Sequence, residues 1–165
     1  SDVCSSDLVL DSPSARVYCG DFLSNEAAEG GAIYALGDTT LTIGSDGSLF
    51  DSLFSGNSAN SAGGAIRTTN GKLEIFNASF DGNVTAAASG GGGAIYAFGL
   101  VEATDSSFVG NSTGSVGGAI TTSDYATLTR SLFSDNQSGQ HGGADRKSTR
   151  LNSSHVSESR MPSSA

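Results

Sequence analysis

The stretch GAIRTTNGKLEIFNASFDGN, from Gly64 to Asn83, holds one full unit of the repeat that decides the fold. It reads as three short strands, Ala65–Arg67, Lys72–Phe76 and Ala78–Phe80, separated and followed by turn pairs of Asn and Gly. No segment sustains the apolar period of about 3.6 residues that marks a helix. About three strands in 25 residues predict one coil of a parallel β-helix, whose coils hydrogen-bond to those above and below.

Two motifs alternate five times along the chain: F-x-x-N, and then Gly-Gly-Ala, which usually continues into Ile. Successive glycine pairs lie 33, 29, 25 and 25 residues apart, a spacing typical of stacked repeats. We therefore predict an all-β parallel β-helix (solenoid) of about five coils, a rod of roughly 24 Å. The structural repeat positions are Phe22, Asn25, Phe54, Asn57, Phe80, Asn83, Phe108, Asn111, Phe133 and Asn136, the glycines Gly30, Gly31, Gly63, Gly64, Gly92, Gly93, Gly117 and Gly118, and the isoleucines Ile33, Ile66, Ile95 and Ile120.

Each repeated residue type has an expected physical role. The phenylalanines should stack on one another one coil apart, because neighbouring strands lie about 4.8 Å apart and aromatic rings attract at that separation. The isoleucines should form a second interior ladder. An asparagine at a corner can satisfy turn backbone groups and tolerate left-handed dihedral angles, so we expect an asparagine ladder. The glycine pairs allow a tight bend or a positive φ where a side chain would crowd the next coil.

The two ends of the chain do not fit the repeat. Asp145–Leu151, DRKSTRL, can be encoded by a nucleotide sequence whose reverse complement encodes Ser1–Leu8, SDVCSSDL. That sequence is similar to a short-read sequencing adapter read in opposite directions. We therefore expect three segments: an adapter artefact at residues 1–8, a β-helix repeat fragment of a longer gene product at 9–144, and a disordered adapter artefact at 145–165, with neither artefact in ordered contact with the solenoid.

The charge balance narrows the classes of partner. The net charge is −9, and residues 9–144 carry all of it, with 13 acidic and four basic residues. This disfavours nucleic-acid binding, which relies on Lys and Arg to neutralise phosphate, and suits an acidic soluble or cell-surface protein. Cys19 is the only cysteine in that segment, so no disulfide framework or Cys/His zinc pattern exists. We expect no metal site and no cofactor.

The alternating motifs resemble the polymorphic outer-membrane-protein repeat known from chlamydial surface proteins. The resemblance covers nearly all of Gly20–Ala144 and rests on the F-x-x-N units and on GGAI or GGAIY at Gly30, Gly63, Gly92 and Gly117. It implies a right-handed β-helix, the hand that parallel crossovers also prefer, in an autotransporter-like surface protein with an adhesion role. The implied location is the cell surface, outer membrane or extracellular space. The implied partners are host or neighbouring-cell surface proteins or glycans, with membrane association only through a missing C-terminal region.

The alternative function is a polysaccharide-active β-helix enzyme, a pectin lyase-like hydrolase or lyase. Such chemistry needs several carboxylates at defined separations. The candidate groups are Asp51, Asp81, Asp105 and Asp135, with Arg130 as a possible cation, and they do not share one repeat position. Asp51 and Asp105 lie three residues before their phenylalanine, where the other coils have Cys19, Asn77 and Arg130, whereas Asp81 directly follows its phenylalanine and Asp135 lies two residues after it. Three or more of Asp81, Asp105, Arg130 and Asp135 in one cleft would favour the enzyme. We assign no catalytic residue and favour the non-enzymatic surface protein, because no repeat position accumulates catalytic groups.

Other features carry weaker expectations. Tyr34 and Tyr96 follow their isoleucines and should point outward as possible carbohydrate-stacking platforms, with Arg67 and Thr121 breaking any continuous aromatic strip. His141 should be a turn residue. Two segments, Asp38–Leu49 and Thr85–Gly91, should be tolerated loops, because they lengthen the repeat.

Overall fold

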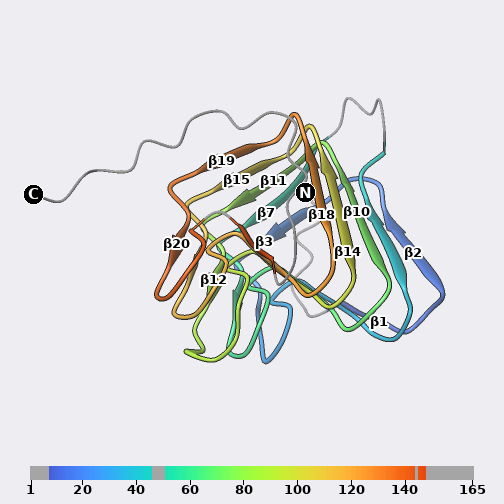
Figure 1. Cartoon of the computed structure of the whole chain (residues 1–165). Coiled ribbons are helices and arrows are strands. Elements are labelled where there is room, and N and C mark those ends of the chain that lie inside the picture. Colours follow the sequence, from blue (N-terminus) through green and yellow to red (C-terminus); the bar gives the residue numbers. More distant parts are fainter. Residues whose placement is uncertain (1–7, 46–50, 144, 148–165) are drawn as a thin grey trace, which may run out of the picture.

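The computed structural model describes residues 8–45, 51–143 and 145–147. These residues form a parallel β-solenoid of about five coils, which confirms the predicted fold class. Each coil contributes one strand to each of four parallel sheets, numbered I to IV in chain order, and the strands of a sheet lie side by side along the solenoid axis (Figure 1).

The strand bounds follow the repeat. Sheet I contains β1 (Leu8–Leu10), β5 (Ile33–Ala35), β9 (Ile66–Thr68), β13 (Ile95–Ala97), β17 (Ile120–Thr122) and β21 (Asp145–Lys147). Sheet II contains β2 (Ser14–Val17), β6 (Thr40–Ile43), β10 (Lys72–Phe76), β14 (Leu100–Thr104) and β18 (Ala126–Thr129). Sheet III contains β3 (Asp21–Leu23), β7 (Ser52–Ser55), β11 (Ala78–Asp81), β15 (Ser107–Val109) and β19 (Leu132–Ser134). Sheet IV contains β4 (Glu26–Ala27), β8 (Ser58–Ala59), β12 (Val84–Thr85), β16 (Ser112–Thr113) and β20 (Gln137–Ser138).

The coil therefore has four strands where the sequence predicted three. The extra strand belongs to sheet IV and contains only two residues in every coil, as in Val84–Thr85. A two-residue strand is too short to show an alternating apolar pattern, so its only sequence signal is its place after the asparagine. The longer strands do alternate: in β10, Leu73 and Ile75 are fully buried while Lys72, Glu74 and Phe76 are half-buried.

The interior consists of ladders of like residues. The five phenylalanines stack face to face along sheet III, with ring centroids 4.6 to 4.8 Å apart and interplanar angles of 2 to 9°. Four isoleucines pair in register along sheet I and are fully buried: Ile33, Ile66, Ile95 and Ile120. Sheet II adds the column Leu41, Leu73, Val101. The core is thus a thin column that every coil extends by one layer.

The asparagines form a hydrogen-bonded ladder between sheets III and IV. The Nδ2 atom of Asn83 donates to Phe54 O and to Asn111 Oδ1, both at 2.9 Å. Its Oδ1 atom accepts hydrogen bonds from the backbone N–H of Asn57 at 3.0 Å and from Asn57 Nδ2 at 2.9 Å. Asn57, Asn83 and Asn111 are fully buried, and this network satisfies the polar atoms of the Asn83 amide without water.

The residue directly before each ladder asparagine has a left-handed backbone conformation. That residue has φ between 53 and 63° in all five coils: Ser24, Gly56, Gly82, Gly110 and Asp135. The asparagines themselves are not among the described residues with positive φ, so their tolerance of left-handed dihedral angles is not what selects them here. The turn of the preceding residue directs the asparagine side chain inward, where the adjacent coils provide its hydrogen-bond partners.

The glycine pair at the start of each sheet I strand is required by close packing. Gly63 has a φ of 66°, and a Cβ atom on it would lie 2.2 Å from Ile66 O. A Cβ atom on Gly64 would lie 2.0 Å from Gly93 O in the next coil. Neither contact is possible for a real side chain, so the first glycine makes the bend and the second admits the neighbouring backbone.

Two predicted loops are shorter than the sequence suggested. Within Asp38–Leu49, residues Thr40–Ile43 form the regular strand β6, in register with β2 and β10, and residues 46–49 lie outside the described residues. Within Thr85–Gly91, Thr85 ends β12 and Gly91 forms an isolated bridge to Val116. The Gly, Asp and Ser residues that flank β6 hid its alternation, because those residue types normally mark turns.

The solenoid also extends further toward the ends than predicted. Leu8 pairs with Ile33 as the first residue of β1, and β21 pairs with β17. The prediction that residues 1–8 and 145–165 make no ordered contact is therefore wrong at Leu8 and at Asp145–Lys147. Backbone hydrogen bonds do not depend on side-chain identity, so an edge strand can pair with any extended segment that reaches it. The other residues of these two segments lie outside the described residues, and their adapter origin stays a prediction.

Candidate functional site

A polar groove lies at the corner between sheets II and III. Its volume is about 340 Å³, and its wall repeats one residue position in successive coils: Asp51, Asn77, Asp105 and Arg130, accompanied by Ala78, Ser79, Ser106, Ser107 and Leu132. Asn77, Asp105 and Arg130 each lie directly between a sheet II strand and a sheet III strand, so the register of the two sheets aligns them along the axis.

The backbone of this corner is left-handed at three residues that are not glycine. The φ angles are 48° at Asn77, 51° at Asp105 and 47° at Arg130. Asparagine and aspartate adopt this conformation more readily than other residues with a Cβ atom, whereas arginine rarely does. The chain thus keeps functional groups at a corner where glycine would be the least strained residue.

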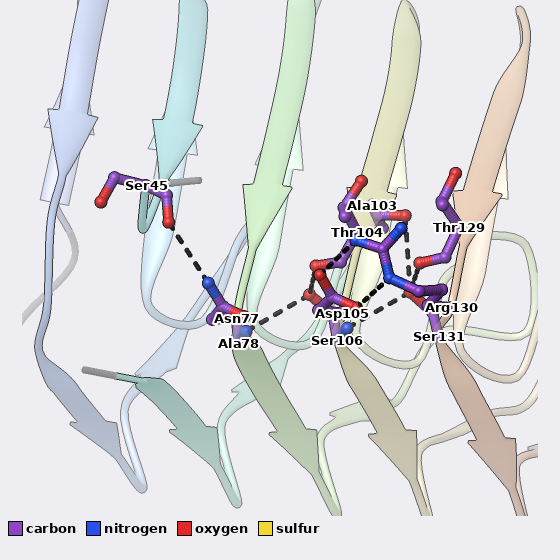
Figure 2. A network of polar contacts seen from close by, with 10 residues as sticks. All are labelled: Ser45, Asn77, Ala78, Ala103, Thr104, Asp105, Ser106, Thr129, Arg130 and Ser131. Atoms are coloured by element: carbon purple, nitrogen blue, oxygen red, sulfur yellow. Dashed lines mark hydrogen bonds and ion pairs between the residues drawn. The ribbon is translucent and has the colours of Figure 1, made fainter. Parts of the chain in front are cut away.

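Asp105 and Arg130 form a two-pronged ion pair across adjacent coils. Arg130 Nε donates to Asp105 Oδ1 and Arg130 Nη2 donates to Asp105 Oδ2, both at 2.6 Å (Figure 2). The hydrogen bonds from Arg130 lower the pKa of the Asp105 carboxyl below its usual value; desolvation opposes this shift, and the charge of Arg130 adds to it. Both side chains are solvent-exposed, so the pair contributes little to stability.

Backbone and hydroxyl contacts hold the groove wall beneath this pair. Ser106 Oγ donates to Thr104 O at 2.9 Å and accepts from the backbone N–H of Ala78 at 3.3 Å. The Ser79 and Ser107 hydroxyls lie 2.7 Å apart on the neighbouring strands. Figure 2 shows the Ser106 contacts recurring one coil further on, where Ser131 Oγ accepts from the backbone N–H of Ser106 at 3.3 Å and donates to Thr129 O at 3.0 Å.

The remaining acidic candidates do not enter the groove. Asp81 ends β11 and Asp135 follows β19, which places both near the opposite corner, between sheets III and IV. Asp135 there accepts a hydrogen bond from Ser134 Oγ at 2.7 Å. Of the four groups named as the test for an enzyme, only Asp105 and Arg130 meet, so the convergence of three is not present.

Tyr34, Arg67 and Tyr96 form a stack on the outer face of sheet I, which sequence reasoning missed. The guanidinium carbon of Arg67 lies 5.6 Å from the ring centroids of both tyrosines, and Arg67 also forms an ion pair with Glu29. Burial, and then a hydrogen bond with Glu29, raise the pKa of Tyr34. Arg67 therefore continues the aromatic strip that it was expected to break. Its guanidinium group covers one face of each tyrosine ring, so that face is not open for stacking against a sugar.

A second charged cluster lies on the outer face of sheet II. Lys72 Nζ lies 2.8 Å from Glu74 Oε1 and 2.9 Å from Glu102 Oε2. Hydrogen bonds with these glutamates raise the pKa of Lys72, and the bond from Lys72 lowers the pKa of Glu74. Glu74 and Glu102 occupy paired positions in adjacent coils, so the lysine offsets the repulsion between their carboxylates.

His141, the last residue singled out from the sequence, lies in the backbone hydrogen-bonding pattern of the solenoid. His141 forms an isolated bridge with Val116, and its carbonyl oxygen accepts a hydrogen bond from Gly117 N. Within the part of the chain that the structure describes, no three metal-ligating side chains gather into a possible ion site. In the same residues there is no helix of the length and hydropathy needed to cross a membrane.

Comparison with known proteins finds one family. The Chlamydia polymorphic membrane protein repeat matches the chain twice, at residues 51–69 and 77–97. Each match begins near the corner groove and ends at or just after a sheet I strand, so each spans most of one coil. No curated protein and no solved structure matches the chain significantly. The chain is thus a parallel β-solenoid in which two segments match the Chlamydia polymorphic membrane protein repeat.

Proposed function

We propose that this chain is part of a cell-surface or secreted, autotransporter-like repeat protein whose solenoid presents a rod for adhesion or interaction. The observation that carries the proposal is the match of two coils to the Chlamydia polymorphic membrane protein repeat. The proposed location is the outer surface of a cell or the extracellular space. The proposed partners are proteins or glycans on host or neighbouring cells.

The division of residues between the two sides of sheet III supports this function. The inward column is phenylalanine in every coil, whereas the outward column one residue earlier changes from coil to coil: Asp21, Leu53, Ser79, Ser107 and Leu132. Because the ladders supply the stability, outward positions are free to vary without loss of the fold. A constant core with a variable surface suits a protein that contacts other molecules through its sides.

The experiment is a binding assay with the folded chain. Fluorescently labelled protein is added to cultured animal cells and to bacterial cells, and bound label is measured as the concentration rises. The proposal predicts saturable binding to at least one cell type. Excess unlabelled folded chain should compete with this binding, and excess heat-unfolded chain should not. Binding that never saturates on any cell type contradicts an adhesion role. Release of reducing sugars from pectin or xylan by the chain would instead establish the enzyme.

A further inference from the structure

We propose that the corner groove between sheets II and III binds a neutral, hydroxyl-rich glycan chain lying along the solenoid axis. This proposal rests on the proposed surface function, and it names the class of ligand that the protein would bind and the site that would bind it. The groove is defined by Asp51, Asn77, Asp105 and Arg130 together with the hydroxyls of Ser79 and Ser107.

The first argument is the retention of side chains at a strained corner. Asn77, Asp105 and Arg130 all have positive φ, and such a conformation costs on the order of 1 kcal/mol or more for a residue with a Cβ atom. At the next corner the chain uses glycine at the left-handed position in three consecutive coils: Gly56, Gly82 and Gly110. The side chains at the groove corner are therefore not needed to make the turn, which points to a role outside the fold.

The second argument is the chemistry of the wall. Carboxylates, an amide, hydroxyls and a guanidinium all form hydrogen bonds with sugar hydroxyls, and the flat Asp105–Arg130 pair offers both acceptors and donors at one place. Leu132 is 51% exposed beside it and gives the apolar face of a sugar ring a surface to contact. A mixed wall of a few polar groups and one apolar side chain is a usual composition for a ligand site.

The third argument excludes acidic glycans. Among the described residues that line the groove, Arg130 is the only cation, and Asp105 already pairs with it, while Asp51 adds a further carboxylate. The protein as a whole carries a net charge of −9. A uronate, sialylated or sulfated chain would therefore meet repulsion, whereas a neutral chain would not.

The fourth argument separates a glycan from an extended peptide. The groove crosses the strands, and β11 and β15 beneath it are already paired on both edges, so no backbone groups remain for an added strand. Polar side chains recur once per coil, about every 4.8 Å, whereas a peptide advances about 3.3 Å per residue. A β-linked pyranose chain advances by about one coil per ring, so four wall positions in four coils fit about four sugar units, roughly 14 Å between the first and last.

The experiment is titration of the isotopically labelled chain with neutral tetrasaccharides: cellotetraose, xylotetraose and mannotetraose. Amide chemical shifts are followed by NMR, and tetragalacturonate serves as the acidic comparison. We expect at least one neutral tetrasaccharide to shift amides at residues 77–79, 105–107 and 130–132. Its affinity should rise with chain length up to about four units, and tetragalacturonate should bind at least tenfold more weakly.

The matched variants are Asp105→Gly and Asp135→Gly. Both aspartates have left-handed φ, 51° and 56°, so glycine fits both sites, but only Asp105 lies in the groove. We expect Asp105→Gly to weaken tetrasaccharide binding at least tenfold without lowering Tm, and Asp135→Gly to leave binding unchanged. Equal effects of the two variants, shifts confined to another face, no binding of any neutral tetrasaccharide, or equally tight binding of tetragalacturonate would overturn the proposal.

Cell binding separates this proposal from the function on which it rests. If the chain binds cells saturably but binds none of the three tetrasaccharides, the adhesion function is supported and the glycan groove is rejected. Tetrasaccharide binding in the groove by a chain that attaches to no cell would support the groove and reject adhesion.

Discussion

Replacing Asn83 by alanine should destabilise the solenoid far more than the same change at Asn25. The Asn83 side chain makes four hydrogen bonds inside the ladder: two donated by Nδ2 and two accepted by Oδ1. At about 1 kcal/mol for each net hydrogen bond, Asn83→Ala should lower the free energy of unfolding by about 4 kcal/mol. The orphaned N–H of Asn57 and carbonyl of Phe54 are buried, so their lost partners are not replaced by water.

Asn25 provides the matched control because it begins the same ladder. Among the described residues its side chain makes one hydrogen bond, from Nδ2 to Asn57 Oδ1 at 2.8 Å. Asn25→Ala should therefore cost only about 1 kcal/mol. Urea unfolding followed by far-ultraviolet circular dichroism measures both variants against the parent chain. A loss at Asn83 no larger than that at Asn25 would refute the claim that the buried amides stabilise one another along the axis.

Three further variants test other parts of the structure. Phe80 is fully buried between two stacked rings and Phe133 is half-buried against one, so Phe80→Ala should cost about 3 to 5 kcal/mol and Phe133→Ala clearly less in the same urea assay. Gly64→Ala should prevent folding or lower Tm severely, because its Cβ atom would lie 2.0 Å from Gly93 O. The control Gly82→Ala, at a φ of 59° but with open space around it, should cost only about 1 kcal/mol. Similar Tm values for the two variants would contradict the close-approach argument. Arg130→Gln should raise the pKa of Asp105 toward its usual value in an NMR titration of its carboxyl carbon. Because the folded pKa of Asp105 is lowered, the stability from this pair is present above the unfolded pKa and is lost as pH falls through the folded one; an unchanged pKa in the variant would show that Arg130 is not the cause.

The repeat spacing was enough to predict the parallel solenoid, because each glycine pair and phenylalanine recurs once per coil and stacking is the only way to bury so thin a core. The same counting placed Asp51, Asn77, Asp105 and Arg130 at one position, three residues before the phenylalanine of the last four coils, with Cys19 at that position in the first. It could not show that Arg130 turns back onto Asp105, since that contact depends on side-chain reach between coils.

Features built from unlike residues were harder to predict. The Tyr34–Arg67–Tyr96 stack joins different side chains in three coils, so the sequence shows an interrupted column although the structure is continuous. Strand β6 was hidden by the turn residues that flank it. The left-handed residue before each asparagine varies between Ser, Gly and Asp, so its identity alone gave no constant signal.

Scalar couplings across hydrogen bonds test the stacked-coil register most directly, because they identify each donor and acceptor by residue. The structure places the N–H of Ile66 on Ala94 O and the N–H of Ile95 on Ala119 O, both at 2.9 Å, and the N–H of Asn57 on the side-chain carbonyl of Asn83 at 3.0 Å. We predict NMR couplings between those pairs, each joining residues one coil apart. Couplings that instead join neighbouring strands within one repeat, as in antiparallel hairpins, would contradict the parallel solenoid and the ladders that depend on it.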